Sequence, residues 1–235
     1  MIPIRDDQPR FSTPYVNYFI VGLNTLAFLY ELSIQASGRH ALDRFVYQFG
    51  VVPTHVELAL AHLNVSGAFL PILTSMFLHG GWLHIIGNMW FLWIFGDNIE
   101  DHLGHFSYLV FYLICGFAAA VTHILFNFGS NEPTVGASGA IAGVMGAYVL
   151  LYPRARVLTL VPLIVFFTFW WLPAWIFLGY WFVIQFLSGA AMSIAETSRG
   201  TGGIAFWAHV GGFVAGIVLI KIFPQRPRRY RYGTW

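Results

Sequence analysis

Six long apolar segments recur along this chain and constrain its fold more than any other feature. A helix that crosses a bilayer needs about 20 consecutive apolar residues. Only 9% of the residues are charged, whereas soluble domains average about 25%. We therefore expect an all-α polytopic membrane protein built as one membrane domain over residues 1–235. The predicted spans are 16–33, 82–99, 106–128, 136–152, 174–191 and 204–223.

The segments between the predicted spans have distinct characters. Residues 1–14 form an N-terminal segment, residues 15–223 form the six-span bundle, and residues 224–235 form a basic tail. Residues 34–75 are too polar and too interrupted by proline to cross as a simple helix, so we expect an interfacial, partly structured connection. Residues 157–173 contain two prolines, which predicts an interfacial or re-entrant piece. The short fourth span is rich in small residues, which favours packing inside the bundle.

Basic residues are distributed unevenly between the two sides of the predicted bundle. Cytoplasmic segments of membrane proteins carry an excess of Lys and Arg. With the N-terminus inside, nine basic residues face the cytoplasm and three face the outside. We therefore expect a multi-pass protein of the plasma or inner cell membrane, with both termini cytoplasmic. The second, fourth and sixth spans then begin near the outer face, where their N-terminal ends can meet.

Polar side chains at these three helix starts suggest chemistry. Polar and ionisable residues within spans are costly and are functional candidates by default. Ser138 begins the fourth span, and His209 lies near the start of the sixth. A serine hydroxyl becomes a useful nucleophile when a neutral imidazole takes its proton. Because no acidic residue lies in a span near this pair, the sequence predicts a catalytic dyad without a carboxylate.

Hydrogen-bond donors accompany the predicted dyad. His84 and Asn88 lie four residues apart near the start of the second span, on one face of a helix. Their side chains, with the backbone N–H of Ser138 at a helix N-terminus, can donate to the oxyanion that develops during acyl transfer. We predict that these three groups stabilise the transition state.

Small residues provide a reason for close helix packing. Gly139 and Gly143 lie four residues apart on the fourth span, as do Gly212 and Gly216 on the sixth. Stripes of this kind let helix backbones approach closely in membranes. Together with Gly136 before the serine, they are predicted to support the contact between Ser138 and its base.

Other interpretations stay open at this stage. The same polar groups would also suit a non-catalytic membrane binding protein, such as a transporter or a protein that retains a client helix. A metal or haem protein is disfavoured because no His-x-x-His pair lies inside a span, and we expect neither metal nor cofactor. With a net charge of +2, nucleic acid is not expected as a partner. The oligomeric state is left open. Several tryptophans, Trp90, Trp93, Trp170, Trp171, Trp175 and Trp181, are predicted to face lipid or its interface.

Four motifs in this chain resemble those of the rhomboid family of intramembrane serine proteases, in its six-span prokaryotic form. They are Gly136-Ala137-Ser138-Gly139, His209 with Gly212 and Gly216, His84 with Asn88, and Glu100 with Gly104. The resemblance implies a six-transmembrane-helix rhomboid bundle with a membrane-lying first loop, Ser138 as nucleophile and His209 as base. It also implies that the substrates are single-pass membrane proteins, cleaved near small, helix-destabilising residues. The fifth span and residues 192–203 would act as gate and cap.

Two positions depart from the pattern of the resembled family. Many members carry a Trp-Arg pair in the first loop, which this chain lacks. Some members place a tyrosine one turn after the nucleophile, where it stacks on the histidine. Here that position is Ala142, so we expect another group to orient His209.

Overall fold

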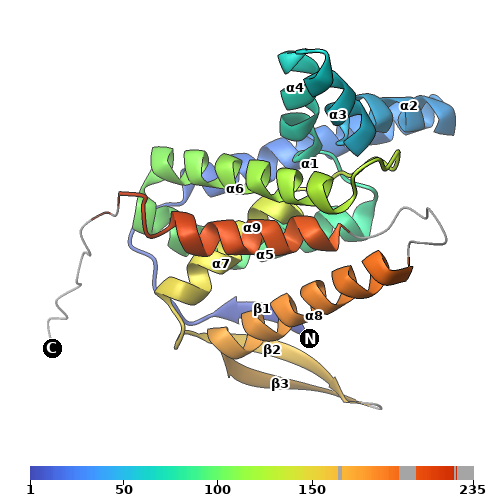
Figure 1. Ribbon diagram of the computed structural model, residues 1–235. Coiled ribbons are helices and arrows are strands. Elements are labelled where there is room, and N and C mark those ends of the chain that lie inside the picture. The colour runs from blue at the N-terminus through green and yellow to red at the C-terminus, as the bar shows by residue number, and fades with distance from the viewer. Residues whose placement is uncertain (164–165, 196–204, 225, 227–235) are drawn as a thin grey trace, which may run out of the picture.

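The computed structural model describes residues 1–163, 166–195, 205–224 and 226 (Figure 1). Most of the predicted cap at 192–203 and most of the predicted basic tail at 224–235 lie outside these described residues.

Helices occupy all six segments that were predicted to be spans. Among the described residues, α1, α6 and α8 are long and apolar enough to cross a membrane. The helices α7 and α9 are apolar but shorter, and α5 has an acidic C-terminal end. The positions of these helices are confirmed, while the count of six spans stays a prediction. Their bounds are α1 Tyr15–Ala36, α5 Trp82–Leu103, α6 His105–Phe126, α7 Ser138–Leu151, α8 Ala174–Ala195 and α9 Phe206–Leu219.

The centre of the bundle is α7, which packs against α5, α6, α8 and α9. Every residue from Gly139 to Tyr148 is buried. Alanine and glycine dominate this stretch, so the neighbouring helices can surround it closely. The prediction that the fourth apolar segment packs inside the bundle is confirmed.

Three short helices make up the connection between α1 and α5. They are α2 Arg39–Phe49, α3 Pro53–Ala61 and α4 Val65–Ser75, and they gather beside α1 on one side of the bundle (Figure 1). Pro53 opens α3, where its missing N–H costs nothing. The Asn64 side chain caps α4 by accepting the Gly67 N–H at 3.0 Å. The expected partly structured connection is confirmed, and its position on a membrane stays a prediction.

The described chain is mostly helical as predicted, but a three-stranded antiparallel sheet means that it is not all-α. Its strands are β1 Ile2–Asp6, β2 Arg156–Leu163 and β3 Phe166–Pro173, in the order β1-β2-β3. The piece predicted as interfacial or re-entrant is thus a hairpin, and the N-terminal segment adds a third strand. The physical reason is composition, because aromatic residues dominate β3 and Val157, Thr159 and Val161 alternate with leucines in β2. Both kinds of residue suit a pleated surface.

Burial alternates along β2 and identifies the face of the sheet that packs on the bundle. Val157 and Thr159 are fully buried, whereas Leu158 and Leu160 between and beyond them are half-buried. Such a period of two is expected for a strand with one packed face. Most side chains of β3 are exposed aromatic rings, namely Phe166, Phe167, Phe169, Trp170 and Trp171.

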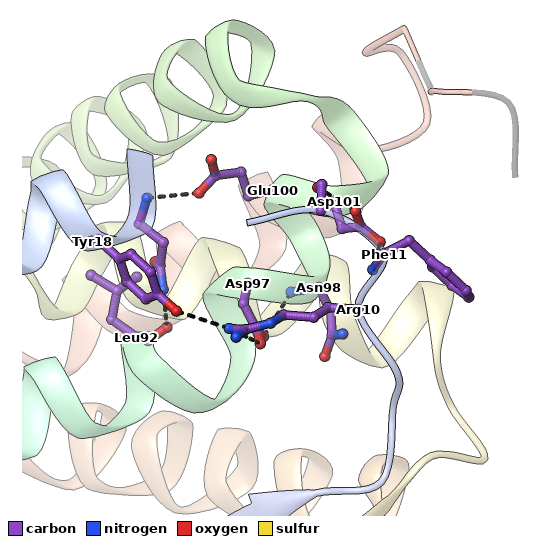
Figure 2. Close-up of polar contacts among 10 residues, drawn as sticks. Arg10, Phe11, Tyr18, Leu92, Asp97, Asn98, Glu100 and Asp101 are labelled. Atoms are coloured by element: carbon purple, nitrogen blue, oxygen red, sulfur yellow. Dashed lines mark hydrogen bonds and ion pairs between the residues drawn. The ribbon is translucent and has the colours of Figure 1, made fainter. Parts of the chain in front are cut away.

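Polar contacts join the start of α1 to the end of α5 (Figure 2). The buried Glu100 carboxylate accepts the N–H groups of Val16 and Asn17 at 2.9 and 2.7 Å. A carboxylate is favourable at a helix N-terminus, where N–H groups lack partners. Gly104, at a φ of 83°, then separates α5 from α6, a conformation that favours glycine. Figure 2 also draws contacts of Arg10, Asp97 and Asp101.

The carboxyl of Asp6 gives the fold a pH dependence. Asp6 accepts a hydrogen bond from the Tyr148 hydroxyl, but burial dominates and raises the pKa of Asp6 from 3.8 to about 6. The folded chain therefore binds the proton more tightly, and stability falls as pH rises between these values. Between these pH values we expect the free energy of unfolding of wild type to fall by about 1 kcal/mol relative to that of Asp6→Asn.

Unfolding midpoints in detergent, measured at about pH 4 and at about pH 6.5, check this prediction. The exposed Asp43→Asn controls for the loss of one surface charge. If the difference in unfolding midpoint between wild type and Asp6→Asn were the same at both pH values, the prediction would be contradicted.

Candidate active site

The side chains of Ser138 and His209 are in direct contact. Ser138 is the first residue of α7 and His209 lies in the first turn of α9. The Ser138 Oγ and His209 Nε2 atoms are 2.7 Å apart, within the reach needed for proton transfer. His209 is 8% exposed and Ser138 is half-buried, so the imidazole is shielded while the hydroxyl remains accessible.

Glycines bring the two helices close enough for this contact. A Cβ atom added at Gly212 would lie 1.9 Å from the carbonyl oxygen of Gly139, and one added at Gly216 would lie 1.9 Å from that of Gly143. Real Cβ atoms never approach so closely. The four glycines predicted to support packing are therefore at the α7–α9 contact, one helical turn apart on each helix.

The His84 ring and the Ser138 hydroxyl both lie close to Gly136. Its Nδ1 accepts the Gly80 N–H at 3.3 Å, so the ring proton resides on Nε2. A Cβ added at Gly136 would lie 2.8 Å from His84 Nε2 and 3.5 Å from Ser138 Oγ. Gly136 has a φ of 134°, and only glycine provides both this backbone conformation and the space between the two side chains.

Asn88 carries an amide nitrogen that lacks a partner. The residue is 8% exposed, and within the described part of the chain its Nδ2 has no hydrogen-bond acceptor. Buried donors are nearly always satisfied, so each exception needs an explanation. Asn88 lies one turn after His84 on α5, so its unpaired donor lies on the same helix face as His84.

His79 packs against His84 from the loop before α5. The two rings make an edge contact with centroids 5.2 Å apart. Burial, helped by the neighbouring His84, lowers the pKa of His79 to about 4, so this ring is neutral at physiological pH. Its backbone N–H donates to the buried Glu31 carboxylate of α1 at 3.0 Å. His79 thus supports His84 sterically and adds no charge.

Two residues of α8 at the site were missed by the sequence analysis. Trp181, predicted to face lipid, is instead half-buried, with its ring 5.6 Å from that of His209. Gln185 lies one turn later, and its Oε1 is 2.6 Å from His209 Nδ1. A polar residue within an apolar span is a signal that could have identified Gln185. Nothing in the sequence distinguishes Trp181 from the other tryptophans.

A small cavity borders the serine. Its volume is about 30 Å³, enough for a water molecule or a small side chain. The walls are made mostly of small residues, among them Gly116, Ala119, Ala120, Ala140 and Ala208. Large side chains would not fit beside Ser138 without displacing a helix.

Comparison with known proteins places these motifs in a family. The family model of the rhomboid domain matches residues 66–226, which is more than half of the chain and includes all four candidate residues. This chain belongs to the rhomboid family. It is 28% identical over 176 residues to Rhomboid protein 1, mitochondrial, of Saccharomyces cerevisiae, covering 71% of this chain and 47% of that protein.

Other rhomboid relatives show the same partial coverage. Rhomboid-like protein 11, chloroplastic, of Arabidopsis thaliana is 27% identical over 170 residues, which is 68% of this chain and 54% of the relative. Rhomboid protease GluP of Bacillus subtilis is 37% identical over 90 residues, 38% of this chain and 17% of GluP. The rhomboid chain described here thus spans about half the length of the first two relatives.

Proposed function

We propose that this rhomboid protein is an intramembrane serine endopeptidase that uses Ser138 and His209 as a catalytic dyad. The observation that carries the proposal is the 2.7 Å contact between Ser138 Oγ and His209 Nε2 within a bundle of apolar helices. The proposal is supported by two donors on α5, the ring proton on His84 Nε2 and the unpaired Nδ2–H of Asn88, because acyl transfer needs donors for the oxyanion.

The geometry suggests how each group takes part. His209 Nε2 removes the proton from Ser138 Oγ as that oxygen attacks a peptide carbonyl, and the protonated imidazole then donates to the leaving amine. His84 Nε2–H, Asn88 Nδ2–H and the Ser138 backbone N–H stabilise the oxyanion. Water, activated by the same imidazole, then hydrolyses the acyl-enzyme.

The proposed substrates are single-pass membrane proteins with a small residue at the cleaved bond. The 30 Å³ cavity beside Ser138 supports a small side chain at that position. A peptide bond inside a helix is shielded by its own hydrogen bonds, so local unwinding must precede attack. We further propose that the chain crosses the plasma or inner membrane six times, with both termini in the cytoplasm.

Cleavage of a reporter tests the proposed function. The full chain is reconstituted in liposomes with single-pass reporters whose membrane helices contain Ala or Gly, and mass spectrometry locates any cut. We expect cleavage within or beside the membrane helix, and labelling of Ser138 by a fluorophosphonate. If several reporters stay intact, Ser138 is not labelled and the protein still binds the reporters, the non-catalytic binding function would be favoured instead.

Removal of the Asn88 amide tests the proposed oxyanion site. Because its Nδ2 would donate mainly in the transition state, we expect Asn88→Ala to lower kcat about 100- to 1,000-fold with little change in KM. A matched control is Asn24→Ala, since Asn24 is also buried but its amide donates to Ile20 in its own helix at 2.8 Å. Steady-state cleavage kinetics measure both, and equal kcat values for the two variants would exclude Asn88 from the oxyanion site.

A further inference from the structure

Among the residues that the structure describes, Gln185 is the only group within hydrogen-bond distance of the second nitrogen of the His209 ring. Its side chain points from α8 toward α9, and its Oε1 lies 2.6 Å from His209 Nδ1. The residues on either side of it, Val183, Ile184, Phe186 and Leu187, are 41 to 57% exposed. Gln185 is therefore a polar residue turned inward from a helix whose neighbouring side chains turn outward.

The chemistry of the amide oxygen determines where the imidazole proton resides. An amide oxygen can only accept, so His209 Nδ1 must donate to it. In a neutral imidazole the other nitrogen then carries a lone pair. That nitrogen is Nε2, which is 2.7 Å from Ser138 Oγ. With the opposite tautomer, Nε2 would carry a hydrogen and could not take the serine proton.

Trp181 holds the same ring from one turn earlier on α8. Its ring centroid is 5.6 Å from that of His209, with the planes inclined by 39°. Residues four apart share a helix face, so Trp181 and Gln185 contact the imidazole together. Ala142, where some rhomboid proteins have a tyrosine, offers only a methyl group. The orienting contacts for His209 thus come from α8.

We propose that Gln185 is a positioning residue that fixes the reactive tautomer and orientation of His209. This inference rests on the proposed serine protease function, because it explains how the base is prepared. It goes beyond that function by making the dyad depend on a third helix, which contributes neither the nucleophile nor the base.

Length-matched substitutions separate hydrogen bonding from packing. Gln185→Met keeps the length but has no comparable acceptor, whereas Gln185→Glu keeps the length and an acceptor oxygen. We expect Gln185→Met to lower kcat about 10- to 100-fold with KM changed less than about twofold, and Gln185→Glu to stay within about fivefold of wild type. The matched control is Ile184→Met, which places the same side chain on the exposed face of α8.

The imidazole tautomer provides a readout that does not require proteolysis. Nitrogen-15 NMR of histidine-labelled protein, with His209 assigned by its loss in His209→Asn, distinguishes Nδ1–H from Nε2–H. Wild type and Gln185→Glu should show the proton on Nδ1, and Gln185→Met should show a mixture. This result stands even if no reporter is cleaved, so failure of this inference is distinguishable from failure of the proposed function.

Two outcomes would overturn the proposal. One is a Gln185→Met variant that keeps both wild-type kcat and the Nδ1–H tautomer. The other is a loss of activity that Gln185→Glu shares while the tautomer stays unchanged, since this would indicate a packing role. If Gln185→Met does not fold, Gln185→Leu removes the acceptor at similar volume and is judged by the same two measurements.

Discussion

Ser138→Ala is expected to abolish cleavage of every reporter that the wild-type protein cuts. The alanine retains the fold but has no oxygen to form the acyl-enzyme, while the His209 imidazole that lies 2.7 Å from the hydroxyl loses its partner. Loss of a serine nucleophile costs roughly 10⁵- to 10⁶-fold in kcat. Single-turnover cleavage in liposomes at equal folded yield measures the effect.

A double variant makes this prediction sharper. Because nucleophile and base act as one unit, their losses are not additive. Ser138→Ala with His209→Ala should therefore be no slower than either single variant. Ser107→Ala, in the first turn of α6, controls for the loss of a helical serine far from the site and should cleave normally. Residual cleavage in Ser138→Ala near the wild-type rate would exclude the proposed mechanism.

Gly216→Ala is expected to destabilise the whole bundle, even though it adds a single methyl group. That methyl group would lie 1.9 Å from the carbonyl oxygen of Gly143, which belongs to the backbone of α7 and cannot rotate away. The two helices must separate, and overpacking of this kind costs about 3 kcal/mol or more when backbone is displaced. Cleavage should be lost as well, because α9 carries His209.

The same substitution elsewhere provides the control for this effect. A Cβ added at Gly22 on α1 meets nothing within 4 Å, so Gly22→Ala should gain up to about 1 kcal/mol from helix propensity. Unfolding by sodium dodecyl sulfate, followed by circular dichroism, compares the two variants. If Gly216→Ala unfolded at the same midpoint as Gly22→Ala, the close contact between α7 and α9 would be refuted.

The helices could be predicted from sequence because each rests on a local property. An uninterrupted apolar segment of sufficient length predicts a helix, and helix bounds agreed to within a few residues in most cases. The small-residue composition of 136–152 also predicted the burial of α7. The predicted end of α5 was four residues too early, because polar residues continue that helix beyond its apolar part.

The sheet and the contacts of α8 could not be predicted for a different reason. An apolar segment such as 157–173 is compatible with either a helix or strands, and the pairing of β1 with β2 joins residues far apart in the chain. The approach of Ser138 to His209 could be predicted because the fourth and sixth spans begin on the same side of the membrane. The rotation of α8 that turns Gln185 inward, in contrast, depends on tertiary packing. The absence of a ring at Ala142 indicated that some such group was needed, and the polar character of Gln185 within an apolar span was the sequence signal for which residue it is.

The sheet also constrains the order in which this protein can be completed during synthesis. The strand β1 leaves the ribosome before helices α1 to α7, but its partner β2 begins only at Arg156. The N-terminal residues must therefore wait, unpaired, while α1 through α7 are made. Contacts between such distant residues form slowly because a long loop must close. An assembly defect caused by a change in β1 would therefore arise at this late step, after the helices that carry Ser138 and Asn88 have already been translated.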